Sequence, residues 1–199
     1  MSAALIIRRV GLQKFAATEL RVWDCLAGDG AIWTALDAEF LVAGYTPMAQ
    51  KPILPGCIAA DGLAVAHLQL FPVDSFNVID LHGDRDPLPA WVHLAGRLRH
   101  ETLIFLRVPH DCRVSRDTLA LAGIDPAWEA PVDKACRRYV FQETFARGCA
   151  VMGVAWLARL RDETATHYAV LTKKEIALEP ATVVQVTLNK EAVMTGTKS

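Results

Sequence analysis

The chain has 199 residues, of which 52% are hydrophobic and 22% are charged, and its formal net charge is −1 at pH 7. This composition excludes a disordered chain, because it supplies enough apolar surface for a core. The near-zero charge excludes a whole-protein electrostatic attraction to nucleic acid or membrane, and the length predicts one domain spanning residues 1–199.

The cysteines and the N-terminal residues give an expectation for the compartment. The five cysteines are scattered without a C-x-x-C pair, which argues against a disulfide framework and against a zinc site. The N-terminal apolar run, residues 4–7, is too short for a signal sequence, and no apolar run reaches membrane-spanning length. We therefore expect a soluble, cytoplasmic protein with reduced thiols and no metal site.

Short apolar strands alternate with helices over the first 110 residues. Helical periodicity predicts helices at 12–20, 31–39, 63–70 and 90–99. Short apolar runs predict strands at 21–27, 40–46, 57–60, 75–81 and 101–109. Pro47 is expected to close the second of these strands. The alternation predicts an α/β fold built on a doubly wound, mostly parallel sheet.

The last third of the chain shows a different pattern. Residues 133–147 predict a helix, with Gly148 placed to cap its C-terminus. Residues 148–174 suit either a continued helix or a β-hairpin. We favour the hairpin, because Gly153 would destabilise a helix interior and "ETAT" is typical of a turn. The alternating stretch "TVVQVTLNK" predicts one more edge strand.

The stretch "DCLAGDG", residues 24–30, forms a glycine-rich corner at the end of a predicted strand. In a doubly wound fold, ligands bind outside the carboxyl ends of the strands, and glycine permits the positive φ and close backbone approach that such a corner needs. Trp33 occupies the third glycine position of the dinucleotide fingerprint, so that fingerprint fails. Asp24 and Asp29 suit a cation such as an ammonium group, although both can equally be ordinary turn and capping residues.

The D-x-x-A-G-D-G pattern resembles motif I of the class I S-adenosylmethionine-dependent methyltransferases. Residues 58–87 are similar to the region of nucleic-acid methyltransferases that carries a D-P-Y/F-G-S-P loop, as in the tRNA guanine dimethyltransferases. The resemblance covers about residues 20–174, taken as the domain core, and leaves 175–199 as a C-terminal strand extension. It implies a seven-stranded sheet closed by an antiparallel hairpin, with S-adenosylmethionine as cofactor.

The resemblance also implies roles for individual residues. Asp24 and the glycines after it would line the methionine half of the cofactor, and Asp61 would meet the adenine amino group. The implied cofactor-binding residues are Asp24, Ala27, Gly28, Asp29, Gly30, Thr46, Asp61 and Gly62. The loop that starts at Asp80 would lie beside the methyl acceptor, which makes Asp80 and His82 the candidate catalytic residues. His82 would act as a general base near neutral pH, or else be an ordinary solvated loop residue.

Two departures from that family's pattern affect the expected chemistry. Thr46 stands where the second strand normally ends in a ribose-binding acidic residue. His82-Gly83 replaces the Asp or Asn and Pro of the amine-methylating enzymes. A catalytically inactive binding or partner subunit with the same fold is therefore the alternative to an enzyme, and a nucleotide-dependent oxidoreductase is the weakest hypothesis.

The expected methyl acceptor is a nucleic acid, either RNA or DNA. Between Lys134 and Arg161 there are six Lys and Arg residues and one acidic residue, Glu143. A phosphate backbone can bind such a concentration of positive charge, most directly through Arg137, Arg138 and Arg147. The alternative is an ordinary solvated helix face, and the oligomeric state is left open.

Overall fold

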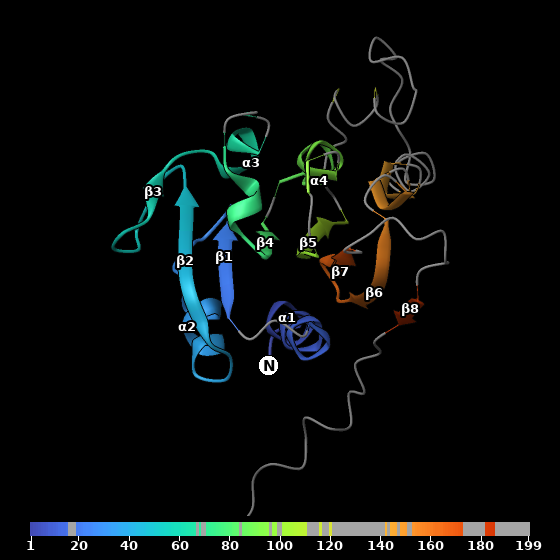
Figure 1. Ribbon diagram of the computed structural model, residues 1–199, viewed down its shortest axis with the longest axis horizontal. Helices are drawn as coiled ribbons and strands as arrows, with labels where there is room; N and C mark the ends of the chain where they lie inside the picture. Colours follow the sequence, from blue (N-terminus) through green and yellow to red (C-terminus); the bar gives the residue numbers. More distant parts are fainter. Residues whose placement is uncertain are drawn as a thin grey trace, which may run out of the picture.

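A single sheet organises the computed structural model. The structure describes residues 1–15, 19–66, 68, 71–83, 85–95, 97–98, 101–110, 116, 120, 142, 144–146, 148–150, 153–172 and 182–185. The described strands are β1 (Leu20–Asp24), β2 (Val42–Ala49), β3 (Ile58–Ala59), β4 (Val78–Leu81), β5 (Leu103–Pro109), β6 (Val154–Arg161), β7 (Ala165–Thr172) and β8 (Thr182–Gln185). Their order across the sheet is β3-β2-β1-β4-β5-β7-β6-β8 (Figure 1).

The strand directions confirm the predicted fold class. Strands β1 to β5 run parallel, and β7 runs antiparallel to both β5 and β6. Seven strands therefore have the order 3-2-1-4-5-7-6 with one reversed strand, and β8 adds to the edge in parallel with β6. The chain changes direction across the sheet between β1 and β4, so the carboxyl ends of these two strands flank the switch point where ligands bind in such folds.

Helices cover both faces of this sheet (Figure 1). The described helices are α1 (Ala3–Lys14), α2 (Ala31–Asp37), α3 (Gly62–Val65), the short 3-10 turn η1 (Val73–Ser75) and α4 (Leu88–Ala95). One core cluster joins α1 and α2 to the sheet through Ile7, Trp33 and Leu36. The other joins α3 and α4 to the opposite face through Leu63 and Trp91. No helix in the described parts is long and apolar enough to cross a membrane.

The N-terminal helix lies earlier than predicted. The sequence predicts a helix at 12–20, but α1 starts at Ala3, where the Ser2 side chain accepts a hydrogen bond from the Leu5 amide. It ends at Lys14, because Phe15 is already extended. The prediction was wrong because the charged pair Arg8-Arg9 interrupts the apolar pattern from which a helix would be predicted. Arg8 is nevertheless buried, on the same side of the helix as Ile7 and Leu12.

Strand β2 is longer than predicted, because Pro47 lies inside it and does not close it. Pro47 is tolerated because of the side of β2 that its backbone faces. The carbonyl of the next residue, Met48, faces the β1 side, since it accepts from the amide of Ala27, in the corner after β1, at 2.9 Å. Backbone groups of successive strand residues point to opposite sides. The backbone of Pro47 therefore faces the outer side of β2. There, β3 pairs only with Met48 and Ala49, so the missing N–H interrupts no ladder.

The predicted C-terminal hairpin is confirmed as β6 and β7. Gly153 precedes β6 with φ +62°, a conformation that a helix interior does not use. The edge strand predicted from "TVVQVTLNK" is present as β8. Most of the helix predicted at 133–147 lies outside the described residues.

Candidate functional site

The glycine corner lies where β1 ends, beside the switch point. The Ala27 amide donates to the Met48 carbonyl of β2, which ties the corner to the sheet. Gly28 has φ +51° and is exposed, and a Cβ added there would meet nothing within 4 Å. Gly30 has φ +72°, and an added Cβ would lie 2.9 Å from a methyl carbon of Leu54. The corner thus presents open backbone at Gly28, where a ligand can approach closely.

Asp29, directly after Gly28, acts as a turn residue, which is one of the two roles that the sequence allows for it. Its side chain is exposed, and its Oδ1 accepts from the Ala31 amide at 3.1 Å, at the start of α2. This bond stabilises the turn into the helix. A contact between Asp29 and a cofactor stays a prediction.

Asp24, the last residue of β1, is buried beneath the corner with 5% exposure. Its Oδ2 accepts from the Tyr45 hydroxyl at 2.9 Å and its Oδ1 from the Leu26 amide at 3.2 Å. Burial, and then the negative charge of Asp80, raise the pKa of Asp24 to about 7. The carboxyl group therefore changes charge near neutral pH, and a cation bound beside it would favour the ionised form.

Asp80, on β4, is fully buried, and both of its oxygens have partners. Arg8 of α1 forms an ion pair with Oδ2, at 2.7 Å from both Nε and Nη2. The Trp33 indole of α2 donates to the same oxygen at 2.8 Å, and the His82 amide donates to Oδ1 at 3.1 Å. This geometry suits Asp80 to support the loop that carries His82 rather than to contact an acceptor.

Asp61 connects three parts of the site. Its Oδ1 caps α3 by accepting from the Leu63 and Ala64 amides, and its Oδ2 accepts from Gln50 at 2.9 Å and pairs with Arg85. Burial would raise the pKa of Asp61, but the hydrogen bonds from Arg85 and from the α3 backbone hold it below its usual value. Asp61 follows β3, at the position that the resemblance gives to the adenine contact, and that contact stays a prediction.

Gly62 has a packing role at the same place. A Cβ on Gly62 would lie 2.2 Å from the Cys25 carbonyl oxygen, so only glycine lets α3 approach the end of β1 this closely. Whether Gly62 also touches a cofactor stays a prediction. The lack of a side chain at Gly62 allows the short distance between the end of β1 and the start of α3, where Asp61 lies.

Thr46 does not lie at the end of β2. It pairs with Trp23 inside the sheet, three residues before the last residue of the strand, Ala49. The sequence placed it at the carboxyl end because Pro47 was expected to close the strand. The first residue after the strand is the exposed Gln50. A ribose contact by Thr46 stays a prediction.

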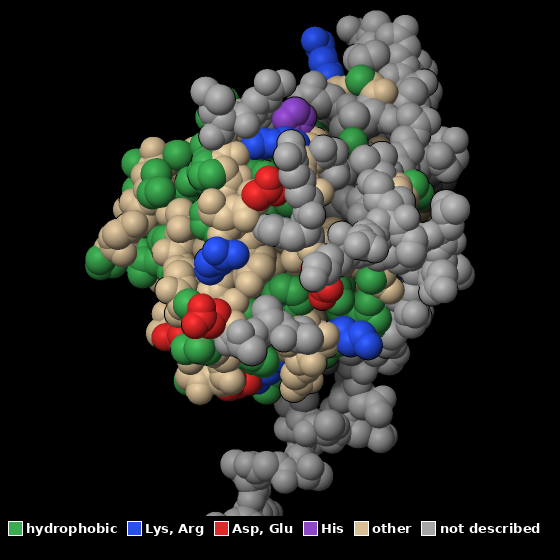
Figure 2. All heavy atoms as spheres, viewed as in Figure 1, with side chains coloured by type: hydrophobic (Ala, Val, Ile, Leu, Met, Phe, Trp, Pro, Cys, Tyr) green, Lys and Arg blue, Asp and Glu red, His purple; other side chains and the backbone are tan. Residues whose placement is uncertain are grey.

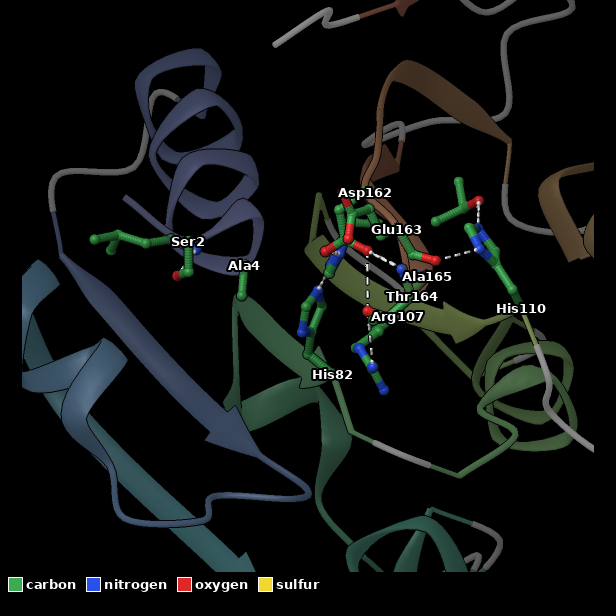
Figure 3. Close-up of polar contacts among 12 residues, drawn as sticks. Ser2, Ala4, His82, Arg107, His110, Asp162, Glu163, Thr164 and Ala165 are labelled. Carbon is green, nitrogen blue, oxygen red and sulfur yellow. Dashed lines mark hydrogen bonds and ion pairs between the residues drawn. The ribbon is translucent and has the colours of Figure 1, made fainter. Parts of the chain in front are cut away.

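Beyond β4, His82 belongs to a row of polar side chains. Its Nε2 lies 2.8 Å from Nδ1 of His167 on β7, and Nε2 of His167 lies 2.8 Å from Oδ2 of Asp162 (Figure 3). Asp162 comes from the β6–β7 turn, where its Oδ1 also accepts from Thr164 and Ala165. Among the described residues no cluster of His, Cys, Asp or Glu side chains could hold a metal ion.

Sequence reasoning missed most of the partners in this site. No role in the site was assigned from the sequence to Arg8, Tyr45, Asp162 or His167. Trp33 was considered only because this residue occupies the third glycine position of the dinucleotide fingerprint. A weak signal existed for His167, because a histidine inside the apolar stretch "HYAVL" has to be satisfied when the strand is buried. No comparable signal marked the others.

The predicted nucleic-acid contacts lie outside the described residues. Arg137, Arg138 and Arg147 are not described, so the structure neither places nor groups them. On the face in Figure 2, the Lys and Arg side chains of the described part stand apart from one another among Asp and Glu side chains. A nucleic-acid surface therefore stays a prediction.

Comparisons with known proteins bear on the fold. No family model matches the chain, and neither does any curated protein. Among solved structures, the chain is similar to a candidate class I S-adenosylmethionine-dependent methyltransferase from Listeria monocytogenes, with a TM-score of 0.50 and 12% identity. The match covers 94% of this chain and 65% of the Listeria protein. This chain therefore spans less than two thirds of the length of the Listeria protein. The order 3-2-1-4-5-7-6 with β7 reversed is the arrangement typical of class I methyltransferases.

Proposed function

We propose that the protein is an S-adenosylmethionine-dependent methyltransferase whose cofactor binds over the glycine corner. The observation that carries this proposal is the open, left-handed Gly28 at the carboxyl end of β1, beside the switch point of a sheet with this strand order. A ligand at that point would lie between Asp24, beneath the corner, and Asp61, beyond β3. The acceptor would lie next to it, beside His82.

The residues at the corner fit the chemistry of the cofactor. The ionised carboxylate of Asp24 suits the methionine ammonium group, and the amide of Gln50 suits a ribose hydroxyl. Asp61 suits the exocyclic amine of adenine by accepting a hydrogen bond. The cofactor supplies a methyl group already activated by a sulfonium, so the chain needs mainly to orient the nucleophile and accept its proton.

The acceptor that we propose is a nucleic acid. The supporting observation is the concentration of positive charge between Lys134 and Arg161 in the sequence. The alternative is a non-catalytic subunit that keeps the fold and the cofactor. The observation favouring that alternative is the replacement of the Asp or Asn and Pro by His82-Gly83. Transfer of labelled methyl groups to RNA or DNA, but not to protein, supports the enzyme, and binding without transfer supports the subunit.

Cofactor binding is tested by thermal unfolding with the reaction product, S-adenosylhomocysteine. At 100 times its dissociation constant, a ligand that binds only the native state adds about 2.7 kcal/mol, which raises the melting temperature of a chain of this size by about 5–10 °C. We expect this rise with the product and none with NAD or ATP. No rise at millimolar product would contradict the cofactor assignment.

A pair of glycine substitutions locates the binding site. Gly28→Asn should abolish the rise in melting temperature, because its side chain would fill the open space that the cofactor needs. Gly153→Asn is the matched control: Gly153 also has positive φ with nothing within 4 Å, but it precedes β6, four strands away from β1 in the sheet. Asparagine tolerates this conformation, so both variants should fold. Equal rises in melting temperature for the two variants would exclude the corner as the binding site.

The ribose contact is tested at the end of β2. Gln50→Ala should weaken product binding by about 2- to 13-fold, which corresponds to the loss of one hydrogen bond of about 0.5–1.5 kcal/mol. Thr46→Val keeps the shape of the side chain and should leave affinity unchanged, because Thr46 lies inside the strand. Isothermal titration with the product measures both. A larger loss with Thr46→Val than with Gln50→Ala would restore Thr46 as the ribose contact.

A further inference from the structure

The row formed by His82, His167 and Asp162 crosses from the interior to the surface. His82 is 9% exposed and His167 is 2% exposed, whereas the side chain of Asp162 is 30% exposed. The two imidazole rings have centroids 4.8 Å apart and planes inclined by 24°. Figure 3 shows Asp162 above His82. Three side chains from separate segments therefore make one continuous hydrogen-bonded path.

The protons in this path can be assigned from its solvent end. Burial would raise the pKa of Asp162, but hydrogen bonds from His167, Thr164 and Ala165 hold it well below its usual range, so this carboxylate only accepts. Nε2 of His167 must then carry the proton that Asp162 accepts. Burial keeps His167 neutral by lowering its pKa, so its Nδ1 has a lone pair and must accept in turn.

The same reasoning fixes the state of His82. Its Nε2 must carry the proton that His167 accepts, which leaves the lone pair on Nδ1. Burial, and then the positive charges of Arg8 on α1 and Arg107 on β5, lower the pKa of His82 well below its usual value. Arg107 also donates to the Gly83 carbonyl at 3.0 Å, which holds the loop against β5. His82 is therefore neutral at pH 7, with Nδ1 available as a base.

We infer that Asp162 and His167 are positioning residues that hold His82 in the tautomer with a basic Nδ1 and stabilise the imidazolium that forms when His82 accepts a proton. This inference rests on the proposed methyltransferase function. As the acceptor bonds to the methyl carbon, the electron pair of the carbon–sulfur bond goes to sulfur, and the proton of the acceptor goes to Nδ1 of His82. His167, held by Asp162, stabilises the resulting imidazolium of His82 by accepting the hydrogen bond from its Nε2. The Nδ1 proton leaves to water once the product has left, which restores the starting tautomer.

Asp162→Asn tests the tautomer directly. The asparagine Oδ1 keeps the hydrogen bonds to Thr164 and Ala165, so the turn should fold. Its Nδ2 replaces the accepting oxygen by a donor, so Nε2 of His167 must accept and its Nδ1 must donate. His82 must then accept at Nε2 and carry its proton on Nδ1. Both histidines are thus expected to exchange tautomers, although no residue beside the acceptor has changed.

Nitrogen-15 NMR of the histidine side chains, in the cofactor-free protein at pH 7, measures these tautomers. We expect a proton on Nε2 of His82 and of His167 in the parent, and on Nδ1 of both in Asp162→Asn. Glu163→Gln is the matched control, because it removes a neighbouring exposed carboxylate that takes no part in the row. A proton on Nδ1 of His82 in the parent, or unchanged tautomers in a folded Asp162→Asn, would overturn the inference.

The rate of methyl transfer gives the second readout. A wrong tautomer on a histidine base costs on the order of 10²–10⁴ in rate, so Asp162→Asn should lose that factor while product binding stays unchanged. Glu163→Gln should keep the parent rate. Transfer by Asp162→Asn at the parent rate would overturn the inference alone. The expected tautomers in a parent that binds the product but transfers no methyl group would instead overturn the proposed function, and the base role of His82 with it.

Discussion

Replacing Arg8 by methionine is expected to lower the free energy of unfolding by about 3–5 kcal/mol, because it leaves the buried charge of Asp80 without its partner. Arg8 is 4% exposed and Asp80 is fully buried, so water cannot replace the lost interaction. The methionine preserves much of the volume of the side chain, which limits the contribution of a cavity. Urea denaturation at pH 7 measures the loss.

The neighbouring arginine is the matched control. Arg9→Met removes an ion pair with Glu39 whose members are 25% and 39% exposed, and such pairs contribute about 0–1 kcal/mol. The double variant Arg8→Met with Asp80→Asn should recover most of the stability, since it removes both charges and keeps an oxygen for Trp33 or for the His82 amide. Equal losses for Arg8→Met and Arg9→Met would show that Asp80 does not depend on Arg8.

Asp24→Asn is expected to change how stability depends on pH. The folded protein holds a proton on Asp24 up to about pH 7, whereas the unfolded chain releases it near the ordinary value of 3.8. Between these values the native state binds more protons, so the contribution of Asp24 to stability falls as pH rises. A difference of about 3 pH units corresponds to about 4 kcal/mol.

We therefore expect the stability of Asp24→Asn, relative to the parent, to rise by on the order of 4 kcal/mol between pH 4 and pH 8. Tyr45→Phe should extend the fall in stability to higher pH than in the parent, because the Tyr45 hydroxyl donates to the ionised form of Asp24 and lowers its pKa. Urea denaturation across this pH range, together with carbon-13 NMR of the Asp24 carboxyl group, measures both effects. If the free energy of unfolding depends on pH in the same way in Asp24→Asn and in the parent, Asp24 does not titrate near pH 7 in the folded protein.

The alternation of strands and helices was predictable because each element carries its own local signal. The corner at Gly28 and the turn before β6 were also predictable, since glycine marks the positive φ that each requires. The extent of β2 was not predictable, because the tolerance of Pro47 depends on how little of the strand β3 covers. Likewise, Arg8 looked like a solvated charge until Asp80, 72 residues away, was placed beside it.

The partner of His82 depends on tertiary structure in the same way. His167 lies 85 residues further along the chain, and it reaches His82 only because β7 pairs with β5 in a register that places His167 opposite Arg107. A shift of that register by one residue would turn the imidazole to the other face of the sheet. Local sequence patterns contain no information on this register, so the position of His82 directly after β4 was predictable but its partners were not.

The position of Pro47 also bears on how the protein avoids aggregation. Among the described strands, only the two residues of β3 lie beyond β2, so the outer side of β2 from Val42 to Pro47 resembles an open sheet edge. A second molecule that added a strand there would need an amide donor at residue 47, and proline has none. The residue that made β2 look too short in the sequence therefore removes one of the amide donors that intermolecular sheet growth along this side of β2 would need.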